Sequence, residues 1–302
     1  MPSLLGVKIP QHLPVNVFFD ILPRMDGQIL LLDELVEEIP DSAVLALAPE
    51  YNGCGCALAA VRALLNRSPK GLHLLGIPAL GLQADLLIGV GAVSTVECAA
   101  VTLGEEGLAP QFSAAVKSGS IKIKDATCPA IHAGLQATEK GIPFMPLRGI
   151  IGSDLLAHRD DWLVGNNPFS LVKEGDPIVF IAALKPDIAL FHAQVADREG
   201  NVWIGVHKEL MTLAHASTKT LVTFETLYDG DLLADEKMAA GTIPSIYISG
   251  LAEAKKGAWP IALPAHYERD AGHIRRYAEL ASSNEGFQQY LMEHVYPKIA
   301  AE

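Results

Sequence analysis

Short apolar segments alternate with segments of helical periodicity along most of the chain. Residues 42–48 (SAVLALA) have the composition of a buried strand, and Leu58, Val61 and Leu65 share one face of a helix predicted over residues 57–65. We expect further strands at residues 71–77, 95–101, 121–124, 144–147, 178–182, 188–195, 202–204, 220–224 and 245–249, and further helices at 130–140 and 208–216. This order predicts an α/β fold whose mostly parallel sheet has helices on both faces.

Pro110 and Gly119 bound another predicted helix, because proline suits the first turn of a helix and glycine its C-terminal end. Residues 287–295 also keep helical spacing. The sequence contains no internal repeat, no low-complexity tract and no convincing linker. We therefore expect a single α/β domain over residues 31–302, closed by a helical segment at 266–302, and an N-terminal extension at residues 1–30.

The charge balance of the chain limits the classes of partner. The chain has 302 residues, 50% of them hydrophobic, and a formal net charge of -12. A surface that binds a nucleic-acid duplex needs clustered Lys and Arg, and the sequence has no such cluster, so no nucleic-acid partner is expected. An anionic small molecule is still compatible with this charge, provided that helix N-termini or a few basic side chains contact it.

Cysteine usage and hydropathy predict the location of the protein. The four cysteines, at positions 54, 56, 98 and 128, include no CxxC pair, and the histidines show no spacing typical of a metal site. The N-terminus lacks a basic start followed by an unbroken apolar run, so no signal peptide is predicted. No segment approaches the roughly 20 uncharged apolar residues of a membrane helix. We expect a cytoplasmic protein without a membrane partner or a bound metal.

Candidate chemistry lies in loops that follow predicted strands, because ligands of open parallel sheets bind beyond the C-terminal strand ends. The first loop, residues 49–56 (PEYNGCGC), offers Glu50, Asn52, Gly53, Cys54 and Gly55. Its glycines allow backbone N–H groups to turn toward an anion, although an ordinary strand-to-helix turn has the same composition. Glu50 is a candidate nucleophile or base, and a surface carboxylate is the simpler interpretation.

The second loop, residues 103–109, contains Gly104, Glu105 and Glu106. A carboxylate can attack a thioester, whereas a solvated loop before a helix is the simpler interpretation. The third loop, residues 125–132, places Cys128 at the predicted N-cap of a helix and His132 one turn along the same face. A helix N-terminus stabilises a thiolate, so this is a candidate Cys–His pair; a buried cysteine and a packed histidine are the alternative.

The fourth loop, residues 147–155, contains Arg148 between a predicted strand and two glycines. Its guanidinium is a candidate partner for the carboxylate or phosphate of a ligand. A structural ion pair would account for this arginine equally well.

Longer strings resemble a known family. GLQATEKGIPFMPLRGIIGSDLL (134–156) resembles the signature of A-type (alpha) chains of the glutaconate branch among family I CoA-transferases. LKPDIALFHAQVADREGNV (184–202), with its HAQ and D..GN groups, resembles the middle of the same fold. Weaker similarity extends from about residue 41 to residue 297.

The resemblance implies an enzyme that moves coenzyme A between carboxylic acids, with coenzyme A as a substrate and no permanently bound cofactor. It implies a B-type (beta) partner chain whose glutamate attacks the acyl-CoA to give an anhydride and then carries CoA as a thioester. This chain would contribute the pocket wall, oxyanion donors and groups that recognise the acid, from Asn52 to Gly55, from Gly104 to Glu106, and at Arg148.

The chain departs from the family pattern at three places. Pro49-Glu50 stands where family members carry a glycine pair, and Cys128 stands where related CoA-ester hydrolases have their glutamate. Residues 104–106 lack the serine that glutaconate-type members place there. A CoA-thioester or ring-cleaving hydrolase using Cys128 with His132, or Glu50, is the first alternative. A non-catalytic protein that binds CoA esters or acids is the second.

Overall fold

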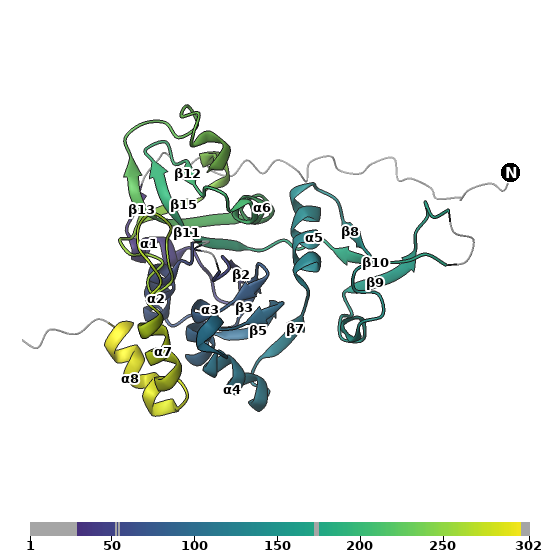
Figure 1. Ribbon diagram of the computed structural model, residues 1–302, viewed down its shortest axis with the longest axis horizontal. Coiled ribbons are helices and arrows are strands. Elements are labelled where there is room, and N and C mark those ends of the chain that lie inside the picture. Colours follow the sequence, from purple (N-terminus) through teal and green to yellow (C-terminus); the bar gives the residue numbers. More distant parts are fainter. Residues whose placement is uncertain (1–28, 52, 54, 172–174, 297–302) are drawn as a thin grey trace, which may run out of the picture.

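A parallel β-sheet forms the centre of the computed structural model, which describes residues 29–51, 53, 55–171 and 175–296 (Figure 1). The main strands are, in sheet order, β1 (Ile29–Leu30), β15 (Gly250–Glu253), β13 (Lys219–Tyr228), β11 (Ile188–Asp197), β2 (Val44–Leu47), β3 (Leu72–Gly76), β5 (Val93–Cys98) and β7 (Lys122–Asp125). Neighbouring main strands are all parallel. The short strands β12 (Val202–Trp203) and β14 (Thr242–Ile243) extend the sheet in antiparallel fashion beside β11.

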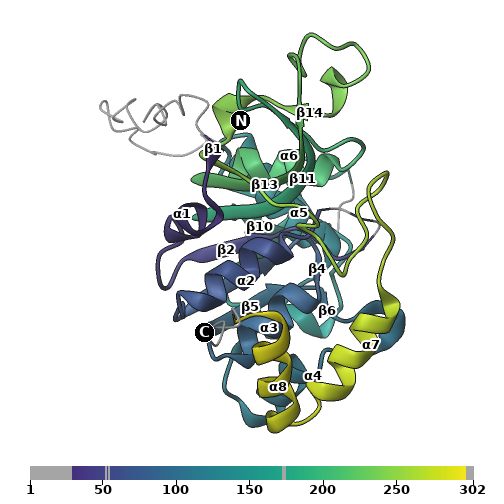
Figure 2. The ribbon, with the colours of Figure 1, turned by 90° about the vertical axis from the view of Figure 1, so that its left-hand side faces the viewer.

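The sheet separates two hydrophobic cores, as the predicted burial of its strands on both faces requires. Leu45 and Leu47 of β2 point into one core, whereas Ala46 points into the other. The first core is covered by α1 (Leu32–Glu37), α2 (Leu58–Asn66), α3 (Leu82–Gly89), α4 (Pro110–Ser118), α7 (Ala271–Leu280) and α8 (Asn284–His294), several of which are grouped in Figure 2. The second is covered by α5 (Cys128–Glu139) and α6 (Lys208–Ala216). The predicted fold class is confirmed.

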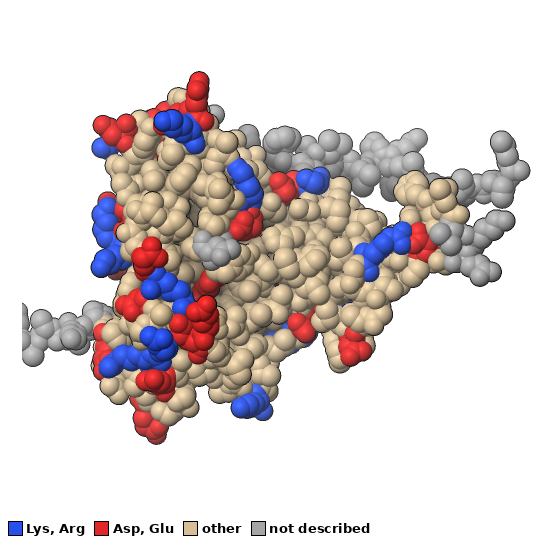
Figure 3. Space-filling view, in the orientation of Figure 1, with Lys and Arg blue, Asp and Glu red and all other residues tan. Residues whose placement is uncertain are grey.

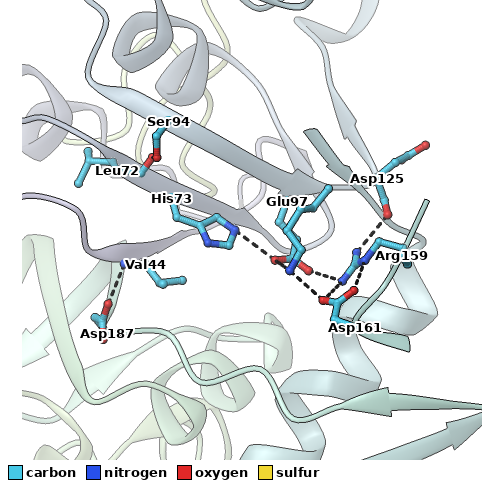
Figure 4. A network of polar contacts seen from close by, with 10 residues as sticks. Val44, Leu72, His73, Ser94, Glu97, Asp125, Arg159, Asp161 and Asp187 are labelled. Carbon is cyan, nitrogen blue, oxygen red and sulfur yellow. Dashed lines mark hydrogen bonds and ion pairs between the residues drawn. The ribbon is translucent and has the colours of Figure 1, made fainter. Parts of the chain in front are cut away.

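A smaller antiparallel sheet lies beyond α5 (Figure 1). It consists of β8 (Phe144–Leu147), β10 (Pro177–Ala182) and β9 (Trp162–Asn166). The sequence analysis expected β8 and β10 but missed β9. This sheet is joined to the main one by a buried ion-pair network around Glu97 of β5 (Figure 4).

The Glu97 network links β5, β7 and the segment that leads into β9. Arg159 Nη2 lies 2.6 Å from Glu97 Oε1, and Arg159 also binds Asp161, which accepts from Lys124 Nζ at 2.8 Å. Burial acts to raise the pKa of Glu97, but nearby His73, Arg159 and Lys124 hold that pKa below its ordinary value. Removing one member of such a buried network leaves an uncompensated charge, so the network fixes the small sheet against the large one.

Some predicted elements need correction. Residues 245–249 form no strand; Ser245–Tyr247 is a short 3-10 turn, and strand β15 follows at Gly250–Glu253. The strand predicted at 95–101 is interrupted, because β5 ends at Cys98 and the two-residue β6 (Ala100–Val101) pairs with β4 (Ala79–Leu80) instead. The division at residue 30 stays a prediction, since residues 1–28 lie outside the described residues. None of the described helices has the length and hydropathy needed to cross a membrane.

Candidate functional site

The first three candidate loops meet one edge of the main sheet, because β2, β5 and β7 are parallel and the loops follow their C-terminal ends. The first and second loops come close together at Gly81. A Cβ atom on Gly81 would lie 2.5 Å from Glu50 Oε2 and 2.6 Å from the Thr102 carbonyl oxygen. Cys128 follows β7, three strand positions from β2, or roughly 14 Å along the sheet. We call this edge the rim.

The first loop turns at Gly53 and Gly55, which have φ angles of 65° and 85°. Residues other than glycine rarely adopt these angles, and there is also no space for a Cβ atom at either position. A Cβ atom on Gly55 would overlap the carbonyl oxygen of His192, whose N–H donates to the Gly55 carbonyl oxygen at 2.7 Å. A Cβ atom on Gly53 would overlap Pro264. The loop is therefore packed closely between β11 and the segment around Pro264; Asn52 and Cys54 lie outside the described residues.

Glu50 is not the surface carboxylate that the sequence suggested. Its two oxygens accept hydrogen bonds from the N–H groups of Leu82 and Gln83, each at 2.6 Å, at the start of α3. Burial raises the pKa of Glu50 to about 7, although the Gln83 and Leu82 amides act to lower it. Because both oxygens are engaged by the helix, this carboxylate is positioned to hold the loop rather than to attack a substrate.

Gln83 forms a second brace, which sequence reasoning missed. Its side-chain oxygen accepts from Ala57 N at 2.9 Å, and its side-chain nitrogen donates to the Ala48 carbonyl oxygen at 3.0 Å. Gln83 thus holds both ends of the glycine loop from a fully buried position. The helical stretch 82–89 offers no local signal of this, because the partners lie 26 and 35 positions away.

The second loop is tied to the C-terminal segment. Glu106 forms an ion pair with Arg269, which also donates to the Leu103 carbonyl oxygen at 2.8 Å. The hydrogen bond from Arg269 keeps the pKa of Glu106 below its ordinary value. Glu105 is exposed, and Gly104 has a φ of 71°. Glu106 therefore serves as a structural partner, while Glu105 faces solvent.

Cys128 is the exposed first residue of α5, and not its N-cap as the sequence suggested. Thr127 is the N-cap, and its side chain accepts from Ala130 N at 3.3 Å. In the described part of the chain no hydrogen bond joins Cys128 to His132. Burial lowers the pKa of His132, while the charge of nearby Glu209 on α6 acts to raise it. His132 therefore interacts with Glu209 of α6 rather than with the Cys128 thiol.

A cleft of about 560 Å³ opens at the rim beside the glycine loop. Tyr51 belongs to that loop, and Gln194 lies in the part of β11 that extends beyond the end of β2. The remaining lining residues are Trp203, Gly205, Val206, His207, Glu209, Pro264 and Ala265. A narrow cavity that shares Gln194 and His207 with the cleft reaches Gly53 and Gly55. This cleft is the candidate site. Of its lining residues, only Tyr51 lies within a loop that the sequence analysis selected, and none was named there as a candidate side chain.

The wall behind the cleft contains a buried histidine and glutamate. His192 Nδ1 lies 2.8 Å from Thr223 Oγ1, and its Nε2 lies 3.2 Å from Glu225 Oε2. Burial acts to raise the pKa of Glu225, but His192 and the amides of Lys256 and Gly257 lower it to about 2. These contacts fasten residues 256–257 to β11 and β13, which supports the segment that carries Pro264.

Arg148 is remote from this arrangement. It lies at the end of β8 in the small sheet, 58% exposed, and forms an ion pair with Asp176. The structural ion pair therefore accounts for it. Among the described residues, His, Cys, Asp and Glu form no group of three suited to a metal ion.

A family model described as Coenzyme A transferase matches residues 30–254. An uncharacterized protein of Archaeoglobus fulgidus is 30% identical over 237 residues, 77% of this chain and 51% of that protein, so this chain spans about half its length. The A-type chain of the 3-oxoadipate CoA-transferase of Pseudomonas knackmussii is 29% identical over 244 residues, 78% of this chain and 83% of the relative. The IpdA chain of the cholesterol ring-cleaving hydrolase of Rhodococcus jostii is 28% identical over 272 residues, 87% and 90% of the two chains.

The fold is also found in a solved structure. The crystal structure of glutaconate coenzyme A-transferase from Acidaminococcus fermentans superimposes with a TM-score of 0.80 and 22% sequence identity. The match covers 88% of each chain. At this identity the likeness demonstrates the fold alone.

Proposed function

Because this chain belongs to the coenzyme A transferase family, we propose that it works in the cytoplasm as the A-type chain of a heteromeric CoA-transferase. The predicted family is confirmed, and so is the assignment to a CoA-transferase chain of the A type. The proposed reaction moves CoA from an acyl-CoA thioester to a second carboxylic acid, and the proposed partner is a B-type chain.

One observation supports this function most directly: the braced glycine loop borders a cleft that is open to solvent on the rim. Positive φ at Gly53 and Gly55 suits a backbone whose N–H groups turn toward a developing oxyanion. Glu50 is engaged by α3, so the attacking carboxylate is proposed to come from the B-type partner.

The proposed chemistry conserves all atoms without water. The partner's glutamate carboxylate attacks the thioester carbonyl, the C–S bond breaks, and CoA leaves as a thiolate, giving an acyl-glutamyl anhydride. The thiolate then attacks the glutamyl carbonyl and releases the first acid as a carboxylate. The incoming carboxylate attacks the glutamyl thioester, and the returning thiolate attacks the new acyl group, which regenerates the glutamate.

The test is exchange of CoA between an acyl-CoA and a labelled carboxylate, measured for the lone chain and for the chain with its B-type partner. We expect exchange only in the pair, because the attacking group is supplied by the partner. Full activity of the isolated chain would refute the two-chain mechanism.

The IpdA relative favours a second candidate, a hydrolase on the same fold. Water would then replace the acceptor acid. Exposed Cys128 would act as the nucleophile, or half-buried His132 as the base, near the rim. Label from ¹⁸O water in the product acid, without any acceptor, would support the hydrolase, whereas an unchanged rate for Cys128→Ala would exclude its cysteine form. Saturable binding of a CoA ester without turnover in any pairing would instead support the non-catalytic alternative.

A further inference from the structure

The cleft beside the glycine loop has an uneven set of charged groups. Its described lining contains the carboxylate of Glu209 but neither lysine nor arginine. His207 is the basic group of the cleft, and its Nδ1 lies 3.4 Å from Glu209 Oε1. This pair is at most electrically neutral, so these lining residues supply no net positive charge.

Apolar surface makes up much of the remaining lining. Trp203 is half-buried, Tyr51 is 39% exposed and Val206 is 84% exposed. Pro264 and Ala265 form the opposite wall. Val206, Pro264 and Ala265 contact hydrocarbon groups favourably and offer no side-chain hydrogen bonds to a carboxylate. Tyr51 and Trp203 add aromatic rings, each with one uncharged hydrogen-bond donor.

Three described cations close to the rim have other partners. Lys208, next to His207, donates to the Ala240 carbonyl oxygen. Arg269 pairs with Glu106, and Lys255 pairs with Glu253 and donates to the Glu225 carbonyl oxygen at 2.6 Å. Charged side chains are also sparse over α5 and the small sheet on the face shown in Figure 3.

We infer that this cleft takes the acyl group of a CoA thioester derived from a monocarboxylic acid with an apolar chain, and disfavours acyl groups that carry a second carboxylate. The inference rests on the proposed function and narrows its substrate class. It separates this chain from the relatives named for glutaconate and 3-oxoadipate, both of which are dicarboxylic acids.

The physical reason is the repulsion between like charges at short range. A second carboxylate within about 4 Å of Glu209 would be repelled in a partly buried site, and the described lining of the cleft contains no lysine or arginine to offset the repulsion. A volume of about 560 Å³ also lies within the range typical of small-molecule sites. We expect at least about a ten-fold preference for the uncharged acyl chain.

The first experiment uses the chain reconstituted with its B-type partner, with acetate as acceptor and either hexanoyl-CoA or glutaryl-CoA as donor. The inference predicts a kcat/KM at least about ten-fold higher for hexanoyl-CoA. An equal or higher value for glutaryl-CoA would overturn it.

The second experiment compares Glu209→Gln with Glu139→Gln. Glu139 is a matched control, because it lies at the C-terminal end of α5, pairs with His215 at 3.3 Å and does not line the cleft. Glu209→Gln should raise the ratio of glutaryl-CoA to hexanoyl-CoA turnover about ten-fold, whereas Glu139→Gln should leave that ratio unchanged. Loss of turnover of both donors by a folded Glu209→Gln complex would assign Glu209 to the chemistry and overturn the inference.

The inference and the proposed function fail separately. Absence of exchange with every donor would reject the transferase, but not the substrate class. Equilibrium dialysis of the two thioesters against the complex then decides the class: tighter binding of hexanoyl-CoA supports it, and equal or tighter binding of glutaryl-CoA overturns it.

Discussion

Two carboxylates stabilise two neighbouring helices in the same way. Glu50 accepts hydrogen bonds from the first N–H groups of α3, and Asp85 of α3 accepts from Gln111 N at 3.3 Å and Phe112 N at 2.7 Å at the start of α4. These N–H groups have no partner within their own helix, and the helix dipole favours a negative charge there. Burial raises the pKa of both carboxyls.

The difference lies in what each carboxylate connects. Asp85 is fully buried and also accepts from Tyr277 Oη at 2.6 Å, so it joins α3 and α4 to α7. Glu50 belongs to the loop that continues to Gly53 and Gly55 at the rim. The same local interaction therefore supports helix packing in one place and the candidate site in the other, and only tertiary position distinguishes the two roles.

The largest expected effect comes from the loop itself. Gly55→Ala should lower kcat/KM of the reconstituted complex by more than about 100-fold, because the added Cβ atom would overlap the His192 carbonyl oxygen and displace the loop. Gly91→Ala is the control: Gly91 has a similar φ of 75° but nothing within 4 Å of the added atom. Equal losses of activity in both variants, measured by CoA exchange, would contradict a special role of the loop.

The next effect tests the comparison directly. Asp85→Ala leaves Tyr277 and two helix N–H groups without their acceptor and should lower the free energy of unfolding by about 4 kcal/mol, with kcat of the folded complex within about three-fold of the original. Glu50→Ala should lower kcat by about ten-fold or more, with a smaller loss of stability. Urea unfolding measures the loss of stability, and CoA exchange measures the loss of kcat. A larger loss of stability for Glu50→Ala and a larger loss of kcat for Asp85→Ala would contradict the two assigned roles.

The smallest effect is a dependence of stability on pH. The pKa of Glu50 is about 7 in the folded protein against an ordinary 4.5, so the folded state binds this proton more tightly. Its contribution is complete below the ordinary pKa and is lost as pH rises through 7, by roughly 2 kcal/mol between pH 5 and pH 8. Glu50→Gln should remove that decline in urea unfolding curves.

Glu106 is the control of opposite sign for that measurement. Its pKa is lowered by Arg269, so its contribution is present above the ordinary pKa and is lost as pH falls. Glu106→Gln should leave the decline between pH 5 and pH 8 in place. If the free energy of unfolding of Glu50→Gln fell between pH 5 and pH 8 as much as that of the original protein, the titration of Glu50 would be ruled out as the cause of the decline.

Periodicity along the chain was sufficient to predict the parallel sheet, most of its strands and the loops that follow the C-terminal ends of those strands. Each of these features depends on short-range patterns: which face of a segment is apolar, and where glycine or proline ends it. The prediction failed where local patterns were weak, as at β9 and at residues 245–249, where a turn stands in place of a strand.

The sequence by itself determined the fold class, the family and the position of the glycine loop. Only the tertiary structure decided what the charged residues do: Glu50 reaches α3 across 32 positions, Glu106 meets Arg269 across 163, and Glu209 enters the cleft. The physical reason is that hydrophobic patterning reports which side of an element is buried. The partner of a buried carboxylate depends on which helix end or side chain the folded chain brings beside it.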